Sequence, residues 1–560
     1  MSGEAASLRH RAVAAAKLGR SEEAAALHDR AVALAPDDAK ILNSAGFFFF
    51  TSGQAQRAIA LLRRAIAADS NATEPLFNLA LALTGAGRAE EARLLLLGRE
   101  PSLRAVARYW SIRASAERAL NRRRDALASF ENATRLDPVN PKAAHGRARM
   151  ALETGLPASD FYRLVVAAQP ADREAWLGYA QALEAEGRPG KARETIEALL
   201  VDAPGWVDAL EYLAQLRWTS GETTEFVAHY AAAVACSAEA PIFASWVRML
   251  AGVDRFEQAA DVAAAARRLL GDRPSLALIE AGYRSGAGDF VTADSIFSEL
   301  ELATPERFLS EARHRLRLND AVAAEALCAQ VIMTLPDDVG AWALRGIAWR
   351  LLDDDRSEWL HGQPGLIKSL PLDLDNEYFR RANAYLDNLH DNSACPIGQS
   401  VRGGTQTRGG LFDRHEPEAR HIEKAVQDAV HAYRSGLPAV DETHPLLRHR
   451  DDPWRIAGSW SIRLIDAGRH VAHIHPRGLI SSAAYFAVPA GTADRETKAG
   501  WLELGRPPVD LCVDLPPLTM IEPRAGFCAL FPSTLYHGTR AFSSGKRMSV
   551  AIDINLERSR

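Results

Sequence analysis

The chain contains 560 residues, of which 47% are hydrophobic and 24% are charged, close to the averages of folded globular proteins. This length predicts three or four ordinary domains, or one repeat array with a further domain, and it excludes a single small module. The 66 basic and 71 acidic residues give a formal net charge of -5, which does not match the strongly basic surface of a nucleic-acid binder.

Cysteine usage and hydropathy indicate the compartment. The five cysteines lie far apart and form no C-x-x-C pair, so neither a disulfide framework nor a zinc knuckle is expected. No stretch reaches the roughly 18 apolar residues of a membrane helix, and the first residues lack the apolar region of a signal peptide. We therefore expect a cytoplasmic protein with neither a membrane nor a nucleic acid as partner.

Small and large side chains recur with a period of about 34 residues through the first two thirds of the chain. Gly53 and Ala58, for example, follow Gly19 and Ala24 by 34 residues. The fullest copies are marked by Trp110, Ala126, Phe130, Ala133 and Pro138, by Trp176, Gly187, Ala192 and Pro204, and by Gly288, Ala293, Phe297 and Pro305. Small residues suit the close crossing of two helices, a large residue fills the gap to the next hairpin, and proline ends a helix.

This spacing resembles the tetratricopeptide repeat, in about ten units. The resemblance implies an α-helical solenoid whose concave face binds a protein or peptide partner, and a spacer or dimerisation scaffold is the alternative. The pattern is weakest over residues 141–170 and 241–273. Because each hairpin packs only against its neighbours, we expect the array to stay folded when the rest of the chain is removed.

The composition changes after Arg350. The acidic run Asp353 to Asp355 is followed by the Gly- and Pro-rich stretches GQPG and PLDLD, which place a boundary between a solenoid of residues 1–353 and a second domain of residues 354–560. Amphipathic helices are predicted over 373–390 and 416–436. Beyond Trp454, short β-rich runs alternate with turns, so we expect an α+β domain with an antiparallel barrel or jelly roll.

The motif HVAHIHPRG contains the chemistry-bearing residues of the second domain. If residues 471–475 form a strand, His473 and His475 share one face, while His470 points the other way or lies in the approach turn. His537 follows in FPSTLYHGTR, and Arg547 comes ten residues later in R-M-S. The spacing of His473 and His475 places two imidazoles on one wall.

These motifs resemble the Fe(II)- and 2-oxoglutarate-dependent oxygenases, and the family resemblance covers roughly residues 354–560. It implies a double-stranded β-helix in which His473 is the first metal ligand and His537 the distal one. His475 stands where the family has a carboxylate ligand, so the site has three histidines and lacks one negative charge. Water in the third position, with His475 only close to the metal, is the alternative.

The resemblance also assigns Arg547 and Ser549 to the far carboxylate of the cosubstrate 2-oxoglutarate. A guanidinium forms two parallel charge-assisted hydrogen bonds to a carboxylate, and a serine two residues later on a strand faces the same way. Tyr485 is a further candidate donor to this carboxylate. Residues considered for the substrate side are His470, Trp460, Arg463, Arg402, Thr405 and Thr407.

We therefore expect an oxygenase that hydroxylates a C–H bond with Fe(II) and 2-oxoglutarate, joined to a solenoid that recruits a protein or peptide. No catalytic residue beyond the metal site is predicted. The first alternative is a non-catalytic interaction scaffold with a vestigial metal site, and the second is a three-histidine metal enzyme that does not use 2-oxoglutarate. Arg547 argues against both, because neither needs a carboxylate clamp.

Overall fold

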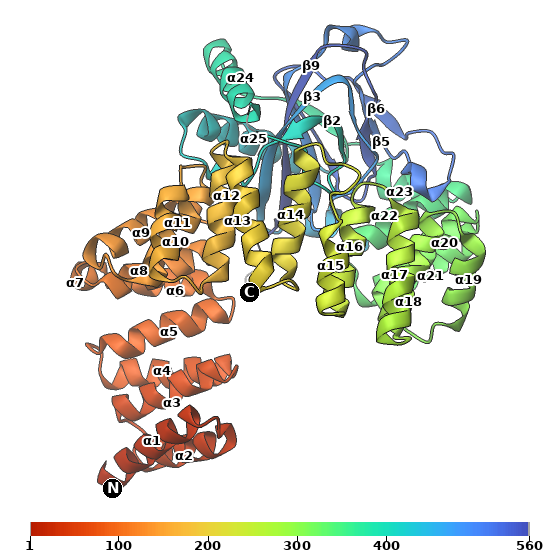
Figure 1. The fold of residues 1–560 in the computed structure, drawn as a ribbon. Helices are drawn as coiled ribbons and strands as arrows, with labels where there is room; N and C mark the ends of the chain where they lie inside the picture. The colour runs from red at the N-terminus through yellow and green to blue at the C-terminus, as the bar shows by residue number, and fades with distance from the viewer. Residues whose placement is uncertain (1, 392, 558–560) are drawn as a thin grey trace. The chain divides into compact units, whose positions relative to one another are not determined.

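A computed structural model describes residues 2–391 and 393–557 of the chain (Figure 1). Residues 2–178 form one compact unit, here the amino-terminal unit, and residues 179–557 form another, the carboxy-terminal unit. The last three residues of the predicted second domain, 558–560, lie outside the described residues.

The amino-terminal unit is built from antiparallel helix pairs. Its helices are α1 (Ser2–Lys17), α2 (Ser21–Leu34), α3 (Ala39–Thr51), α4 (Ala55–Ala68), α5 (Thr73–Gly85), α6 (Ala89–Leu97), α7 (Glu100–Leu103), α8 (Ala107–Ala119), α9 (Arg123–Leu136), α10 (Pro141–Glu153) and α11 (Ser159–Ala168). Helix α12 (Arg173–Ala185) begins in this unit and ends in the next. A Cβ added at Gly46 would lie 2.6 Å from Cγ of Leu62, and one at Gly146 would lie 2.4 Å from the ring of Phe130, so the small residues permit the close helix crossings.

The repeat helices of the carboxy-terminal unit continue the series of antiparallel pairs. They are α13 (Pro189–Asp202), α14 (Val207–Thr219), α15 (His229–Cys236), α16 (Ala240–Ala251), α17 (Phe256–Leu270), α18 (Pro274–Gly286), α19 (Phe290–Glu299), α20 (Pro305–Arg317), α21 (Ala321–Thr334), α22 (Val339–Leu351) and α23 (Arg356–His361). Among the described residues, α1 to α21 without the short α7 make ten successive pairs, and α22 opens a further one. The solenoid predicted from the 34-residue period is confirmed.

A left-handed residue stands between the two helices of every pair. These residues are Gly19, Gly53, Gly87, Asn121, Gly155, Gly187, Gly221, Asp254, Gly288, Asn319 and Asp353. Glycine adopts positive φ without steric cost, and Asn and Asp tolerate it better than other side chains. The turn therefore recurs even in the stretches 141–170 and 241–273, where the residue pattern is weakest.

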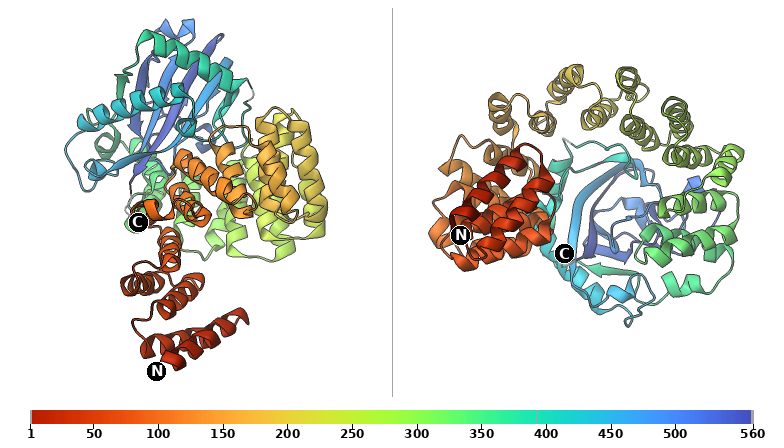
Figure 2. Two further views of the ribbon diagram at one scale, coloured as in Figure 1. Left: turned by 90° about the vertical axis from the view of Figure 1, so that its left-hand side faces the viewer. Right: turned by 90° about the horizontal axis from the view of Figure 1, so that it is seen from below.

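The carboxy-terminal unit also contains an antiparallel β-domain, the predicted α+β fold. Its strands are β1 (Lys368–Pro371), β2 (Val401–Gln406), β3 (Trp454–His470), β4 (Ile480–Ala487), β5 (Leu502–Leu504), β6 (Thr519–Ile521), β7 (Phe527–Pro532), β8 (His537–Thr539) and β9 (Lys546–Leu556), and its helices are α24 (Asn376–His390) and α25 (Pro417–Ser435). A six-stranded sheet has the order β1-β7-β4-β9-β3-β2, and a three-stranded sheet has the order β6-β5-β8. Figure 2 shows the helices from α13 to α22 as an arc around this domain.

Strand β9 has two different faces because side chains alternate along a strand. Met548, Val550 and Ile552 are fully buried in the core beneath α24 and α25, where Phe379 of α24 stacks on Phe486 of β4. The other face of β9 points away from these helices and lines the cavity described next. Helices α24 and α25 thus cover one face of the six-stranded sheet, and the cavity lies on its other face.

One local expectation differs from the structure. Residues 471–479 form no strand, and only His473 makes an isolated antiparallel bridge with His537. The physical reason is topological: β3 belongs to the six-stranded sheet, whereas His537 begins β8 of the three-stranded sheet. The chain after His470 therefore crosses between sheets and cannot extend β3.

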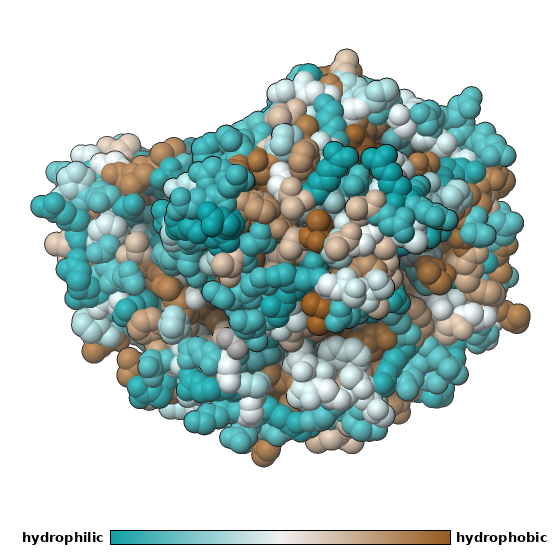
Figure 3. All heavy atoms as spheres, turned by 90° about the horizontal axis from the view of Figure 1, so that it is seen from above, coloured by the Kyte–Doolittle hydropathy of each residue, from teal (hydrophilic) through white to brown (hydrophobic). Residues whose placement is uncertain are grey.

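The surface over the β-domain is mixed in character. Figure 3 shows hydrophobic residues in small groups among hydrophilic ones on the upper face, which is ordinary for exposed protein surfaces. None of the helices in the described part of the chain has the length and apolar character needed to cross a membrane.

Candidate metal and carboxylate site

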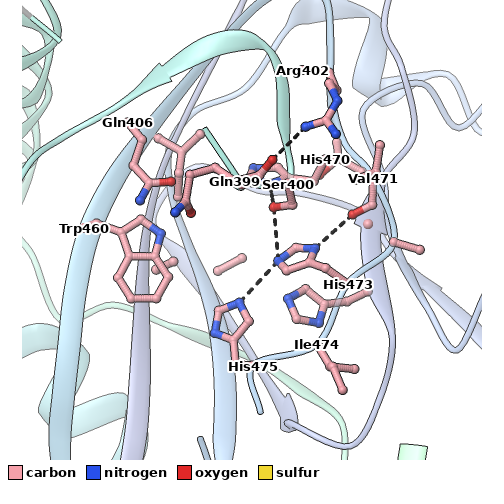
Figure 4. A pocket seen from close by; sticks show the side chains of 18 of the residues that line it. Gln399, Ser400, Arg402, Gln406, Trp460, His470, Val471, His473, Ile474 and His475 are labelled. Atoms are coloured by element: carbon pink, nitrogen blue, oxygen red, sulfur yellow. Dashed lines mark hydrogen bonds between the residues drawn. The ribbon is translucent and has the colours of Figure 1, made fainter. Parts of the chain in front are cut away.

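Three imidazoles converge where the two sheets meet. The potential ligand nitrogens of His473, His475 and His537 lie within 4.8 Å of one another, and the Nε2 atoms of His473 and His475 are 3.2 Å apart. Reciprocal backbone hydrogen bonds of 3.0 and 2.9 Å between His473 and His537 fix the spacing of these two side chains. The H-x-H spacing and the crossing between sheets thus bring all three side chains together, and Figure 4 shows His473 and His475 side by side.

Hydrogen bonds on the far side of each ring direct Nε2 toward this cluster. Nδ1 of His473 donates to the carbonyl of Val471 at 2.9 Å, and Nδ1 of His537 donates to that of Leu535 at 3.1 Å. Burial and the neighbouring His475 lower the pKa of His473 to about 3. Burial and His473 likewise hold the pKa of His537 well below its ordinary value. Both rings are neutral at pH 7, with Nε2 lone pairs that face a common point.

The donor set fits a divalent metal ion. Nε2 of His473 and Nε2 of His475 lie 3.2 Å apart, a separation at which they can share a proton or bind one cation together. Ligand nitrogens at about 2.1 Å from one metal stand roughly 3 Å apart, close to this separation. Imidazole is a suitable ligand for Fe(II), so His473, His475 and His537 would hold this ion.

Asp553 completes the surroundings of His475. Nδ1 of His475 contacts the carboxylate of Asp553 on β9. A carboxylate behind a metal-binding imidazole fixes its tautomer and raises its basicity. Asp553 thus brings a negative charge next to the position where the family motif has a carboxylate and this chain has His475.

The inward face of β9 supplies the remaining polar groups. Arg547, Ser549, Ala551 and Asp553 alternate along the strand, and all four line one cavity with the three imidazoles. The cavity has a volume of about 500 Å³. A guanidinium and a cluster of three imidazoles therefore share one cavity.

Arg547 is a buried cation without an anion. Its side chain is 1% exposed, and no carboxylate in the described part of the chain forms an ion pair with it. Its Nε atom and the hydroxyl of Tyr485 are both buried without a hydrogen-bond partner among the described residues. The guanidinium carbon lies 5.0 Å from the centre of the Tyr485 ring, so two unsatisfied groups stand side by side.

Three of the residues considered for the substrate side line the cavity. The ring of Trp460 lies 5.6 Å from that of His475. His470 stacks on His473 at 5.8 Å, and Arg402 lies at the edge of the cavity. Figure 4 shows Trp460 to the left of His473 and His475 and Arg402 above them.

The other three substrate-side candidates lie outside the cavity lining. Arg463 forms ion pairs with Asp387 and Asp391 near the end of α24. The hydroxyl of Thr405 lies 2.8 Å from Nδ1 of His390, and the backbone N–H of Thr407 donates to the carbonyl of Ser461 at 3.0 Å. These contacts connect β2 and β3 to each other and to α24.

Several cavity residues were not predicted from the sequence. Asp553 could have been found, because it lies six residues after Arg547 on the same strand face. Ser400, whose hydroxyl lies 3.2 Å from Nε2 of His473, follows an irregular segment that carries no motif. Gly252 and Asp254 line the cavity from the solenoid, and nothing in their local sequence indicates this.

The fold and the site define a helical-repeat protein whose carboxy-terminal β-domain holds a histidine cluster. Residues 458–553 match the family model described as "Putative 2OG-Fe(II) oxygenase". Tetratricopeptide-repeat models match residues 49–116, 113–162 and 173–216. The chain therefore combines tetratricopeptide repeats with a carboxy-terminal region that matches the model of this oxygenase family, as its motifs predicted.

Several solved structures are similar to part of this chain. PilF of Pseudomonas aeruginosa is 20% identical, with 38% of this chain and 97% of that chain covered and a TM-score of 0.34. A tetratricopeptide repeat protein from Parabacteroides merdae is 17% identical, with 43% and 97% covered and a TM-score of 0.35. No curated protein matches the sequence.

Proposed function

We propose that the protein is an Fe(II)- and 2-oxoglutarate-dependent oxygenase. The observation that carries this proposal is the buried, unpaired Arg547 in the same cavity as three convergent imidazoles. Leaving a charge buried without a partner costs several kcal/mol, and an incoming carboxylate offsets this cost through a bidentate pair. A generic metal site does not need such a cation.

Each polar group has a separate task in this proposal. Arg547 binds the far carboxylate of 2-oxoglutarate, and the hydroxyl of Tyr485 and Ser549 provide further donors. His473, His475 and His537 would hold Fe(II), which when bound supplies the oxygen chemistry that couples decarboxylation of 2-oxoglutarate to hydroxylation of a C–H bond. Asp553 holds the Nδ1 proton of His475.

The cavity walls orient the substrate and limit water. The indole of Trp460 covers His475, and Ile462 and Ala551 add apolar surface. Gln399 and Gln406 provide amide groups at the same cavity. An apolar lining with a few convergent polar groups is typical of sites for small molecules or single side chains.

The two parts of the chain also have separate tasks. We keep residue 354 as the proposed boundary between solenoid and oxygenase domain. In the carboxy-terminal unit, the inner side of the helical arc faces the β-domain, with Arg408 bound to Glu184 of α12 and Arg317 of α20 bound to Asp510. Recruitment of a protein or peptide is therefore assigned to the repeats of the amino-terminal unit.

Succinate formation from 2-oxoglutarate, with added Fe(II) under air, tests the proposed activity. The wild-type protein should form succinate slowly alone and faster with cell extract that contains the substrate. His537→Ala should form none, because one of three ligands is lost. A wild-type protein that forms no succinate with or without extract would contradict the proposal.

A further inference from the structure

Residues 397–402 connect the solenoid to the β-domain within the carboxy-terminal unit. The backbone N–H of Ile397 donates to the side-chain carbonyl of Gln215 on α14 at 2.8 Å. The N–H of Gly398 donates to the carbonyl of Gly252, which ends α16, at 3.0 Å. Arg402 forms an ion pair of 2.6 Å with Asp254 in the turn before α17. Two successive repeats thus hold one side of this segment.

The other side of the segment reaches the imidazoles. The hydroxyl of Ser400 lies 3.0 Å from Nδ1 of His470 and 3.2 Å from Nε2 of His473. The carbonyl of Ser400 accepts a hydrogen bond from the N–H of Val471 at 3.0 Å. Figure 4 shows Ser400 directly next to His473, with Arg402 beyond it. Only a few residues therefore separate the solenoid contacts from a proposed metal ligand.

We propose that the repeats of the carboxy-terminal unit are part of the oxygenase site, because they fix residues 397–402. The Ser400 carbonyl holds the N–H of Val471, whose own carbonyl accepts from Nδ1 of His473, and the Ser400 hydroxyl holds His470, which stacks on His473. A bound metal ion would take the Nε2 lone pair of His473, so the Ser400 hydroxyl would then keep its contact with His470. Ser400 is a positioning residue in this view, and Gln215, Gly252 and Asp254 act through it. The inference rests on the proposed function, in which His473 is a metal ligand. It assigns these repeats a role inside the site, separate from the recruitment assigned to the repeats of the amino-terminal unit.

Gly252 shows how closely the solenoid approaches this segment. A Cβ at Gly252 would lie 2.8 Å from Cγ2 of Ile397 and 3.0 and 3.1 Å from N and Cα of Gly398. The φ of Gly252 is −63°, an ordinary helical value, so its backbone conformation does not require glycine. What excludes a side chain there is the backbone of the segment that carries Ser400.

The next repeat offers a matched control. Gly286 lies 34 residues later at the end of α18, and a Cβ there would meet Phe256 at 3.5 Å, an ordinary contact distance. Alanine favours helical backbone over glycine at both positions. Gly252→Ala and Gly286→Ala therefore differ mainly in whether they displace residues 397–402.

The test is a titration of the full-length protein with Co(II) alone, followed by visible absorption, which reports the ligands and their geometry. Gly252→Ala should bind Co(II) roughly tenfold more weakly than the wild type and change its spectrum, as expected when support around a ligand is lost. Gly286→Ala should match the wild type. Gln215→Ala, which removes an acceptor without adding bulk, and Ser400→Ala should shift the spectrum in the same direction as Gly252→Ala.

The outcomes separate the two proposals. If circular dichroism shows that Gly252→Ala does not fold, the Co(II) titrations of Gln215→Ala and Ser400→Ala test the proposal instead. Wild-type affinity and spectrum in Ser400→Ala and Gln215→Ala would overturn the link between solenoid and site. A wild-type protein that binds no Co(II) would instead overturn the proposed metal site, and the link with it.

Discussion

His475 is hydrogen-bonded through Nδ1 to the carboxylate of Asp553, which stands on β9 in the same inward-facing row as Arg547. The carboxylate that the oxygenase motif places among the metal ligands is therefore replaced here by a histidine with a carboxylate behind it. The negative charge thus stands behind the imidazole of His475, through which it would act on a bound metal ion.

Loss of this charge should weaken metal binding. Asp553→Asn keeps an acceptor for Nδ1 and removes the charge, so we expect Co(II) affinity to fall about tenfold, with a larger loss in Asp553→Ala. Glu503→Gln, which changes a carboxylate bound to Arg506 elsewhere in the β-domain, is the control. Equal Co(II) affinities of Asp553→Asn and the control, measured by spectroscopic titration, would show that Asp553 does not support the site.

The last repeats and the β-domain share one hydrophobic cluster. Leu316 and Leu344 of the solenoid pack with the fully buried Leu511 and with Tyr536. Leu511→Ala should therefore lower the free energy of unfolding by about 3 kcal/mol. Because the cluster spans both parts, the urea concentration at the midpoint of unfolding should fall by the same amount in far-UV circular dichroism of the helices and in tryptophan fluorescence.

A neighbouring position provides the control for this experiment. Val509, two residues before Leu511, is 93% exposed, so Val509→Ala should leave stability within about 0.5 kcal/mol of the wild type. If the helical signal of Leu511→Ala keeps the wild-type urea midpoint, the solenoid is stable independently of the β-domain, as expected from the repeats alone.

Acid should destabilise the carboxy-terminal unit through buried histidines. Burial lowers the pKa of His361 to about 3, and its Nε2 lies 3.0 Å from the hydroxyl of Thr534. Below pH 6.5 the unfolded chain takes up a proton that the folded protein does not, so stability falls as the pH drops from 6.5 toward 3. At pH 5 this amounts to about 2 kcal/mol relative to pH 7.5.

The variant His361→Gln isolates this contribution, since an amide can still hydrogen-bond Thr534 and does not titrate. Urea unfolding at both pH values should show a loss on acidification that is about 2 kcal/mol smaller in the variant than in the wild type. An identical pH dependence in both proteins would mean that His361 is not responsible.

Periodic features of the fold could be predicted from the sequence. The 34-residue spacing of Gly53 and Ala58 indicated the solenoid, and the alternation in residues 547–555 indicated a strand. The strand expected at residues 471–475 was wrong because the chain crosses there between two sheets, and a crossing has no sequence period. His473 and His475 nevertheless lie together, since backbone hydrogen bonds to His537 hold the segment.

The parts of the site formed by distant segments could not be predicted. Gly252 and Ser400 are 148 positions apart, and only the tertiary fold places both at one cavity. Arg463 and Thr405 lie in motifs of the family, yet their side chains contact residues of α24 or just beyond it and not the cavity. The sequence could not predict this, because the face on which a strand residue lies is known only once the register of β2 and β3 is known.

The central claim is that Arg547 binds 2-oxoglutarate next to a metal held by histidines. Calorimetric titration of 2-oxoglutarate into Co(II)-loaded protein without oxygen tests it most directly, with Co(II) affinity measured in parallel. In Arg547→Ala the dissociation constant for 2-oxoglutarate should rise at least tenfold, since a charge-assisted pair contributes about 2 to 5 kcal/mol, and Co(II) affinity should stay within about twofold. Arg547→Lys should recover part of the loss. Wild-type binding of 2-oxoglutarate by Arg547→Ala would contradict the account.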